Sequence, residues 1–233
     1  METIGRRDFV RLTAAAAAGI AVTSTAAHGA SPTHHPRFAR PETPDVALAR
    51  LMAGNERFVQ GRTVGDRRDL ARVRELAEGQ SPYAAILSCA DSRVPPELLF
   101  DEGFGDLFVV RVAGNVAGTE EVASLEYAAG VLGSQVIMVL GHTSCGAVGA
   151  AAARGAVPGQ ISALFSHILP AVEEAEGDTA EAIRINVRNQ ARLVRRASPV
   201  VAQMVSEGRL RVVGGVYDLA TGSVEIVDRG DRG

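Results

Sequence analysis

Two cysteines and one histidine carry the side chains best suited to holding a soft metal ion. Cys89 and Cys145 are the only cysteines of the chain, and His142 stands three residues before Cys145. Thiolate sulfur and imidazole nitrogen suit zinc, and three protein ligands leave a fourth position for water or substrate. The sequence therefore predicts a zinc ion on Cys89, His142 and Cys145, used for hydrolysis or hydration of a small substrate.

A carboxylate and a guanidinium follow Cys89 at alternate positions, as Asp91 and Arg93. A forked, charge-assisted pair between these two side chains would keep Asp91 ionised. We expect Asp91 to accept a hydrogen bond from water at the metal and Arg93 to hold Asp91 in place. Asp91 is also a conditional fourth ligand, which we expect to bind zinc as the pH falls below about 8.

Three short apolar runs lie before and between Cys89 and His142, and each run is bounded by glycine or proline. They cover Tyr83–Ser88, Leu107–Val112 and Val136–Leu140. Such runs are typical of buried strands in a parallel sheet. Ligands of open α/β sheets lie at the carboxyl ends of the strands, so Cys89 after the first run and His142 after the third are expected to converge.

Helical patterns surround these strands. A helix is expected to begin at Thr43-Pro44, with threonine as its cap and proline in the first turn. A second helix is expected over about 67–78, with Leu70, Val73 and Leu76 facing inward. Further expected elements are helices over Thr119–Leu132, from Cys145 to Gly155, Ile161–Glu174 and Asp178–Arg196, and a final strand pair over Leu210–Tyr217 and Val224–Val227. The pattern predicts a single α/β domain over residues 43–230, with helices on both faces of the sheet.

The first 30 residues have the composition of a secretory signal. Adjacent Arg6 and Arg7 precede an alanine-rich run that ends in small residues, which favours the twin-arginine export route. The apolar run from Thr13 to Val22 is too short and weak for a stable membrane span. We therefore expect a signal peptide over 1–30 and a periplasmic or extracellular location. Prolines in 31–42 favour an extended linker, with His34 and His35 in solvent.

Charge and composition exclude some classes of partner. The net charge is −3, from 24 basic and 27 acidic residues, and no long run of one sign occurs. Nothing in this pattern indicates binding to nucleic acid or to an anionic membrane surface.

A disulfide between Cys89 and Cys145 is the alternative to a metal site, because exported chains often pair their cysteines. The presence of two cysteines fits a disulfide and a metal site about equally well. The twin-arginine route carries folded proteins, so a metal can be inserted in the reducing cytoplasm. Moreover, Asp91, Arg93 and His142 would have no reason to cluster around a plain disulfide. These two considerations favour the metal.

Two stretches resemble the signatures of a known family. Ser88-Cys89-Ala90-Asp91-Ser92-Arg93-Val94-Pro95 and Gly141-His142-Thr143-Ser144-Cys145-Gly146 are similar to the signature stretches of the β-class carbonic anhydrases. The similarity extends over about residues 43–227. It implies zinc on Cys89, His142 and Cys145, with Asp91 and Arg93 paired beside it. It also implies a twisted, mostly parallel sheet with an antiparallel edge strand, and homodimers or homotetramers with sites at subunit interfaces.

Other positions resemble the plant-like branch of that family. Gln80 is similar to its substrate-orienting glutamine, and Phe108 and Tyr127 to its pocket aromatics, although each could be a structural residue. The backbone N–H of Gly146, at a helix start, could help to stabilise an anion. Arg111 is expected to serve in a structural ion pair.

The expected activity is the reversible hydration of carbon dioxide to bicarbonate and a proton. One alternative is hydrolysis of carbonyl sulfide or carbon disulfide on the same scaffold. The non-enzymatic alternative is an exported binding protein stapled by a disulfide.

Overall fold

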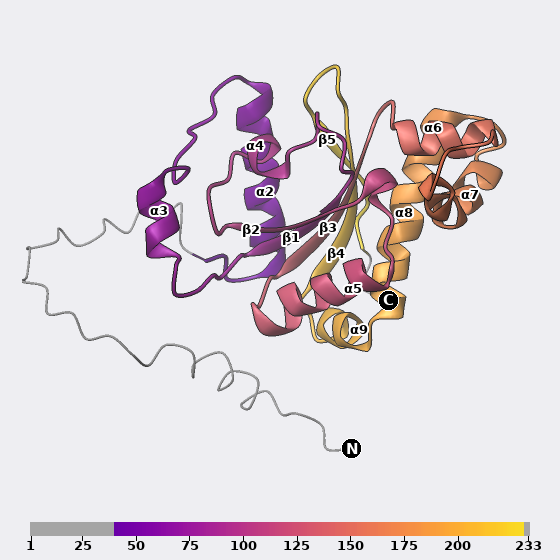
Figure 1. The fold of residues 1–233 in the computed structure, drawn as a ribbon. Helices are drawn as coiled ribbons and strands as arrows, with labels where there is room; N and C mark the ends of the chain where they lie inside the picture. Colours follow the sequence, from indigo (N-terminus) through magenta and orange to yellow (C-terminus); the bar gives the residue numbers. More distant parts are fainter. Residues whose placement is uncertain (1–39, 231–233) are drawn as a thin grey trace, which may run out of the picture. The chain divides into compact units, whose positions relative to one another are not determined.

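The computed structural model of the chain describes residues 40–230 (Figure 1). The expected signal peptide over 1–30 lies outside these residues. So do His34, His35 and most of the expected linker. In the part of the chain that is described, no helix is long and apolar enough to cross a membrane.

A five-stranded sheet in the order β2-β1-β3-β4-β5 forms the centre of the fold. Its strands are β1 Ala84–Ser88, β2 Leu107–Arg111, β3 Val136–His142, β4 Arg211–Tyr217 and β5 Val224–Asp228. The first four strands run parallel, and β5 pairs antiparallel to β4 at the edge. Every residue of β1 and β3 is buried, as expected for central strands covered on both faces. The predicted fold class is confirmed.

Helices cover both faces of the sheet and enclose two apolar cores. The helices are α2 Pro44–Val59, α3 Leu70–Glu75, α4 Pro96–Leu99, α5 Thr119–Glu126, α6 Gly146–Ala153, α7 Phe165–Glu174, α8 Thr179–Ala197 and α9 Pro199–Ser206, with the short segments η3 Ala113–Asn115, η4 Tyr127–Val131 and η5 Ile161–Leu164. One core packs α2 and α4 against one face, and the other packs α5 to α9 against the opposite face (Figure 1). Each strand therefore contributes alternate side chains to the two cores.

Helix starts follow the capping chemistry of the sequence. Thr43 Oγ1 accepts the Val46 N–H at 3.3 Å where α2 begins, which confirms the predicted start. Asp178 caps α8 by accepting the N–H groups of Ala180 and Glu181. The helix α9 was not expected from the sequence, although Ser198 caps it and proline occupies its first turn.

The prediction for the second helix is wrong in length and in packing. It extends only from Leu70 to Glu75, and Leu70 and Val73 are 60% and 41% exposed. Only Leu76 packs closely, because a Cβ at Gly105 would lie 2.6 Å from Leu76 Cδ1. The three apolar residues share one face of the predicted helix, but α3 is held to the rest of the fold by Leu76 and by Arg72, whose Nε donates to the Phe104 carbonyl at 3.3 Å.

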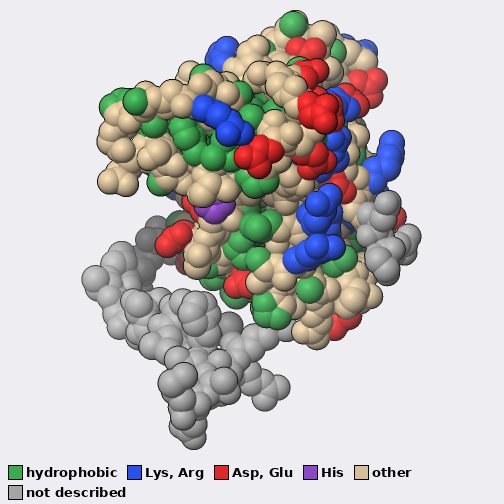
Figure 2. Space-filling view, turned by 90° about the vertical axis from the view of Figure 1, so that its right-hand side faces the viewer, with side chains coloured by type: hydrophobic (Ala, Val, Ile, Leu, Met, Phe, Trp, Pro, Cys, Tyr) green, Lys and Arg blue, Asp and Glu red, His purple; other side chains and the backbone are tan. Residues whose placement is uncertain are grey.

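Charges of both signs are mixed on the surface. On the face shown in Figure 2, acidic and basic side chains lie among one another, and neither sign forms a continuous patch. This mixture fits the small net charge of −3. It offers no extended basic surface on that face for a nucleic acid backbone.

Candidate metal centre

The carboxyl ends of β1 and β3 bring Cys89, His142 and Cys145 together. The two strands are adjacent and parallel, with Ser88 paired to Leu140, so their ends lie side by side. The ligand atoms of the three residues lie within 4.8 Å of one another, and all three residues are buried. The two Sγ atoms are 4.0 Å apart, and both cysteines are free thiols.

The donor atoms of this cluster fit a zinc ion. Two thiolates on one tetrahedral zinc would place their sulfurs about 3.8 Å apart, close to the observed separation. His142 Nδ1 lies 2.9 Å from the Thr143 carbonyl oxygen and donates to it, which directs the lone pair to Nε2. Nε2 is buried and has no hydrogen-bond partner among residues 40–230. A metal would satisfy this nitrogen, whose burial without a partner is otherwise costly.

The electrostatics of the two cysteines also favour a cation between them. The Cys145 side chain lowers the pKa of Cys89, while burial opposes this change. In turn, the contact with Cys89, burial and repulsion from the charge of Cys89 all raise the pKa of Cys145. Backbone N–H groups of Val148 and Ala147, in the first turn of α6, offset only part of this rise. Both thiols can be ionised near neutral pH only if a positive charge lies beside them.

Asp91 lies beside the cluster as an ionised carboxylate. Arg93 donates from Nε to Asp91 Oδ1 at 2.9 Å and from Nη2 to Oδ2 at 2.8 Å. Mainly through these bonds, Arg93 holds the pKa of Asp91 well below its usual range. Asp91 Oδ2 is 3.7 Å from His142 Nε2. The carboxylate is thus close enough to act on a molecule at the fourth position of the metal.

Arg111 has a role that the sequence analysis missed. It was expected in an ion pair, but it donates to the backbone carbonyls of Cys89 at 3.2 Å and of Asp91 at 2.6 Å. Those carbonyls lie just past the end of β1, where the strand ladder no longer supplies partners. The available signal was position, because Arg111 pairs with Ser88 at the end of the neighbouring strand.

Gly146 directly follows Cys145 and is the first residue of α6. The N–H groups in the first turn of a helix have no partner within the helix, so that of Gly146 is available to an anion.

Three expected substrate residues do not reach the cluster within one chain. Gln80 is exposed and precedes β1, at the end of the strand opposite Cys89. Phe108 pairs with Ala85, which lies about 13 Å along the strand from Cys89. Phe108 and Tyr127 form their own aromatic contact, with ring centroids 6.1 Å apart.

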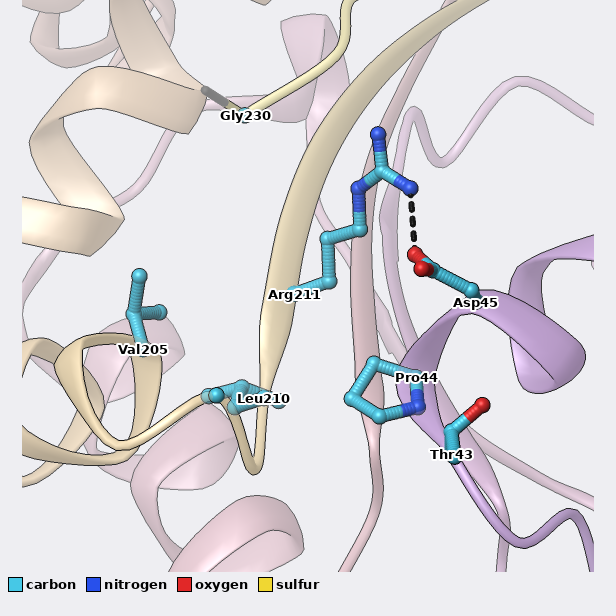
Figure 3. Close-up of a pocket in the computed structure, with 8 residues that line it drawn as sticks. Thr43, Pro44, Asp45, Val205, Leu210, Arg211 and Gly230 are labelled. Atoms are coloured by element: carbon cyan, nitrogen blue, oxygen red, sulfur yellow. Dashed lines mark hydrogen bonds and ion pairs between the residues drawn. The ribbon is translucent and has the colours of Figure 1, made fainter. Parts of the chain in front are cut away.

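A separate cavity of about 440 Å³ lies near the amino-terminal end of β4, away from the cluster (Figure 3). Its lining residues are Thr43, Pro44, Asp45, Val205, Gly208, Leu210, Arg211 and Gly230. Arg211 Nη1 contacts Asp45 Oδ1 at 2.6 Å, so the two charged side chains that line the cavity are paired with each other. These lining residues include no histidine or cysteine.

Comparison with known proteins agrees with this geometry. The family model described as carbonic anhydrase matches residues 84–224. The chain is 37% identical over 193 residues to carbonic anhydrase 2 of Mycobacterium tuberculosis, covering 79% of this chain and 93% of that one. It is 39% identical to the carbonic anhydrase of Mycolicibacterium smegmatis, covering 78% and 93%. The solved β-carbonic anhydrase of Coccomyxa superposes with a TM-score of 0.60 at 28% identity, covering 77% of this chain and 85% of that one. The chain therefore belongs to the β-class carbonic anhydrases.

Proposed function

We propose that this chain catalyses the zinc-dependent, reversible hydration of carbon dioxide to bicarbonate and a proton. The observation that carries the proposal is the unpartnered, buried Nε2 of His142, which faces two thiols with an ionised Asp91 at 3.7 Å. Membership in the carbonic anhydrase family supports carbon dioxide as the substrate.

The side chains around the cluster have distinct roles in this proposal. Zinc, when bound by Cys89, His142 and Cys145, would act as a Lewis acid and lower the pKa of a bound water. Asp91 accepts a hydrogen bond from the attacking water and orients its lone pair toward carbon dioxide. Arg93 keeps Asp91 ionised and aimed, and the N–H of Gly146 is available to a bicarbonate oxygen.

The proposal extends to a homodimer or homotetramer of the plant-like branch, in which Gln80, Phe108 and Tyr127 complete the site of a neighbouring subunit. Three features support it. The three residues lie away from the cluster of their own chain. The strand β2 ends the sheet, so one of its edges pairs with no other described strand. Tyr127, whose ring contacts Phe108 of β2, is 38% exposed, and Val131, four residues later, is 48% exposed, so a second copy would cover them.

The alternatives receive no comparable support. The carbonic anhydrase family and relatives do not favour hydrolysis of carbonyl sulfide or carbon disulfide. A disulfide-stapled binding protein is not supported either, because Cys89 and Cys145 are free.

We also propose that the protein acts in the periplasm or outside the cell. This rests on Arg6, Arg7 and the alanine-rich run that follows them.

The test of the function combines metal analysis with rapid carbon dioxide hydration kinetics. The wild type should hold one zinc per chain and hydrate carbon dioxide faster than it hydrolyses carbonyl sulfide. Cys89→Ser, His142→Ala and Cys145→Ser should each lose zinc and more than about 100-fold of the activity, because even outer-shell changes at metal sites cost about 10–100-fold. Full zinc content with full activity in any of these variants would contradict the assignment, provided that circular dichroism shows a folded chain.

A further inference from the structure

Two carboxamides lie buried on the core side of α8. Asn186 and Gln190 are 1% and 4% exposed and are four residues apart, so they occupy the same face of the helix. Their neighbours on this face include the buried Val187 and Ala191. Polar groups in such an apolar stripe destabilise a fold unless they are hydrogen-bonded.

Both carboxamides bind the turn that includes η3. Asn186 Nδ2 donates to the Gly114 carbonyl at 2.9 Å, and Gln190 Oε1 accepts the Ala117 N–H at 2.9 Å. Gln190 Nε2 donates to Asn186 Oδ1 at 3.2 Å and to the His167 carbonyl at 3.1 Å. Gln190 thus braces Asn186, and α8 holds the turn at two points.

The turn in question delivers a hydrogen bond to the metal cluster. The Gly114 N–H donates to Cys89 Sγ at 3.3 Å. Gly114 and Asn115 both have positive φ, 75° and 47°, and two successive left-handed residues need support from outside the turn. Glycine suits this position because its φ of 75° strains any other residue, and a Cβ there would also lie 2.8 Å from Ile168 Cδ1, which would have to shift.

The peptide between Gly114 and Asn115 is held at both of its polar ends. Asn186 binds its carbonyl, and its N–H donates to the Val112 carbonyl at 3.0 Å. With this peptide fixed, the direction of the Gly114 N–H depends only on the φ and ψ angles of Gly114 itself.

We propose that Asn186 is a positioning residue for the metal site, which aims the Gly114 N–H at the Cys89 sulfur with Gln190 as its brace. This inference rests on the proposed zinc site. Hydrogen bonds to the ligands of a metal orient them and tune the affinity, so their loss typically costs about 10–100-fold. The effect of Asn186 therefore reaches the metal through Gly114 and Cys89 and needs no contact with substrate.

The decisive variant is Asn186→Asp, which nearly keeps the shape of the side chain but replaces the donor to Gly114 with an oxygen. Zinc affinity, measured by competition with a chelator, should fall about 10–100-fold. In protein loaded with cadmium-113, the scalar coupling between the metal and the Gly114 amide proton should be present in the wild type and lost in the variant.

Asn55→Asp is the matched control. Asn55 is 4% exposed, donates to the carbonyls of Leu99 and Gly222 and accepts the Val224 N–H, in the core on the other face of the sheet. It should lose stability in the same way as Asn186→Asp. Its zinc affinity and its cadmium coupling at Gly114 should stay at the wild-type level.

If Asn186→Asp does not fold, Gln190→Glu carries the test. This variant keeps the acceptor for Ala117 but loses the donor to Asn186, and its zinc affinity should fall several-fold. Zinc affinity and cadmium coupling equal to those of Asn55→Asp, in whichever of the two variants folds, would overturn the positioning role alone. Absence of zinc binding in the wild type would overturn the proposed function and this inference with it.

Discussion

At the scale of single residues, Arg93 fixes the position of the Asp91 carboxylate and keeps it ionised. Its two side-chain hydrogen bonds and its backbone N–H, 3.0 Å from Oδ1, hold the carboxylate on the arginine side. The lowered pKa keeps Asp91 ionised throughout the neutral range. Any change of Asp91 between pH 6 and 9 therefore comes from competition with hydroxide for the metal and does not come from its own titration.

Arg93→Ala should release Asp91 to bind zinc. Without Arg93 the pKa of Asp91 rises toward its ordinary value, yet the carboxylate stays ionised at neutral pH and becomes free to occupy the fourth position. We expect the rate to fall about 10–100-fold near pH 8, with zinc retained and the inactive range extended upward. The measurement is the pH–rate profile from pH 6 to 9 with zinc content at each point, and Arg93→Lys should be intermediate. A flat wild-type profile, or identical rates in the variant, would rule this role out.

At the scale of elements, Asp101 joins the end of α2 to the segment that follows it. Its carboxylate accepts from Arg57 Nε at 2.6 Å and from the N–H groups of Val64 and Gly65 at 3.0 Å. Burial opposes ionisation, but these donors together lower the pKa of Asp101. A lowered carboxylate pKa stabilises the fold above the unfolded value of about 3.9, and the contribution is lost as the pH falls through the folded value.

Asp101→Asn should therefore lower the free energy of unfolding at pH 7 by about 2 kcal/mol, because donors that faced a charge would face a neutral amide. The difference from the wild type should shrink at about pH 3, below the unfolded value of about 3.9, because Asp101 is then largely protonated in the unfolded state. Urea unfolding at the two pH values measures it. Glu225→Gln, in an exposed pair with Arg184, is the control and should change stability little. A loss of equal size at both pH values would show that charge is not the cause.

At the scale of the whole molecule, the proposed assembly depends on the free edge of β2. Val131→Asp places a charge beside exposed Tyr127 and should shift the protein toward monomers in sedimentation experiments. Activity should fall while zinc stays bound, because Cys89, His142 and Cys145 belong to one chain. Ile161→Asp is the control, since Ile161 is 44% exposed and begins η5, the segment directly before α7, and Figure 1 shows α7 on the opposite side of the molecule from β2. A monomeric wild type, or a monomeric variant with full activity, would contradict the proposed assembly.

The proposed export of the protein can be tested by substitutions at its amino terminus. Replacing both Arg6 and Arg7 by lysine should leave the precursor in the cytoplasm, because the twin-arginine route reads that pair. Activity in the lysate should be unchanged. Arg11→Lys is the matched control and should be exported normally. Cell fractionation with immunoblotting gives the answer, and normal export of the double variant would contradict the route.

The sequence by itself determined those features that depend on neighbours along the chain. Apolar runs bounded by breakers located the strands, and Thr43 and Asp178 marked helix starts through their own side-chain caps. The parallel order of strands then implied that Cys89 and His142 would meet, because carboxyl ends share one edge of a sheet.

Tertiary structure alone decided the features that depend on residues far apart in the chain. The helical spacing of Leu70 and Val73 predicts that both are buried in the core. In the structure, no other described element covers enough of α3 to bury them. Arg111 donates to carbonyls twenty or more residues away, and Asn186 binds Gly114 across 72 positions. Such bonds connect side chains to the backbone, and every residue has a backbone carbonyl, so the residue types leave no pattern from which these partners could be identified.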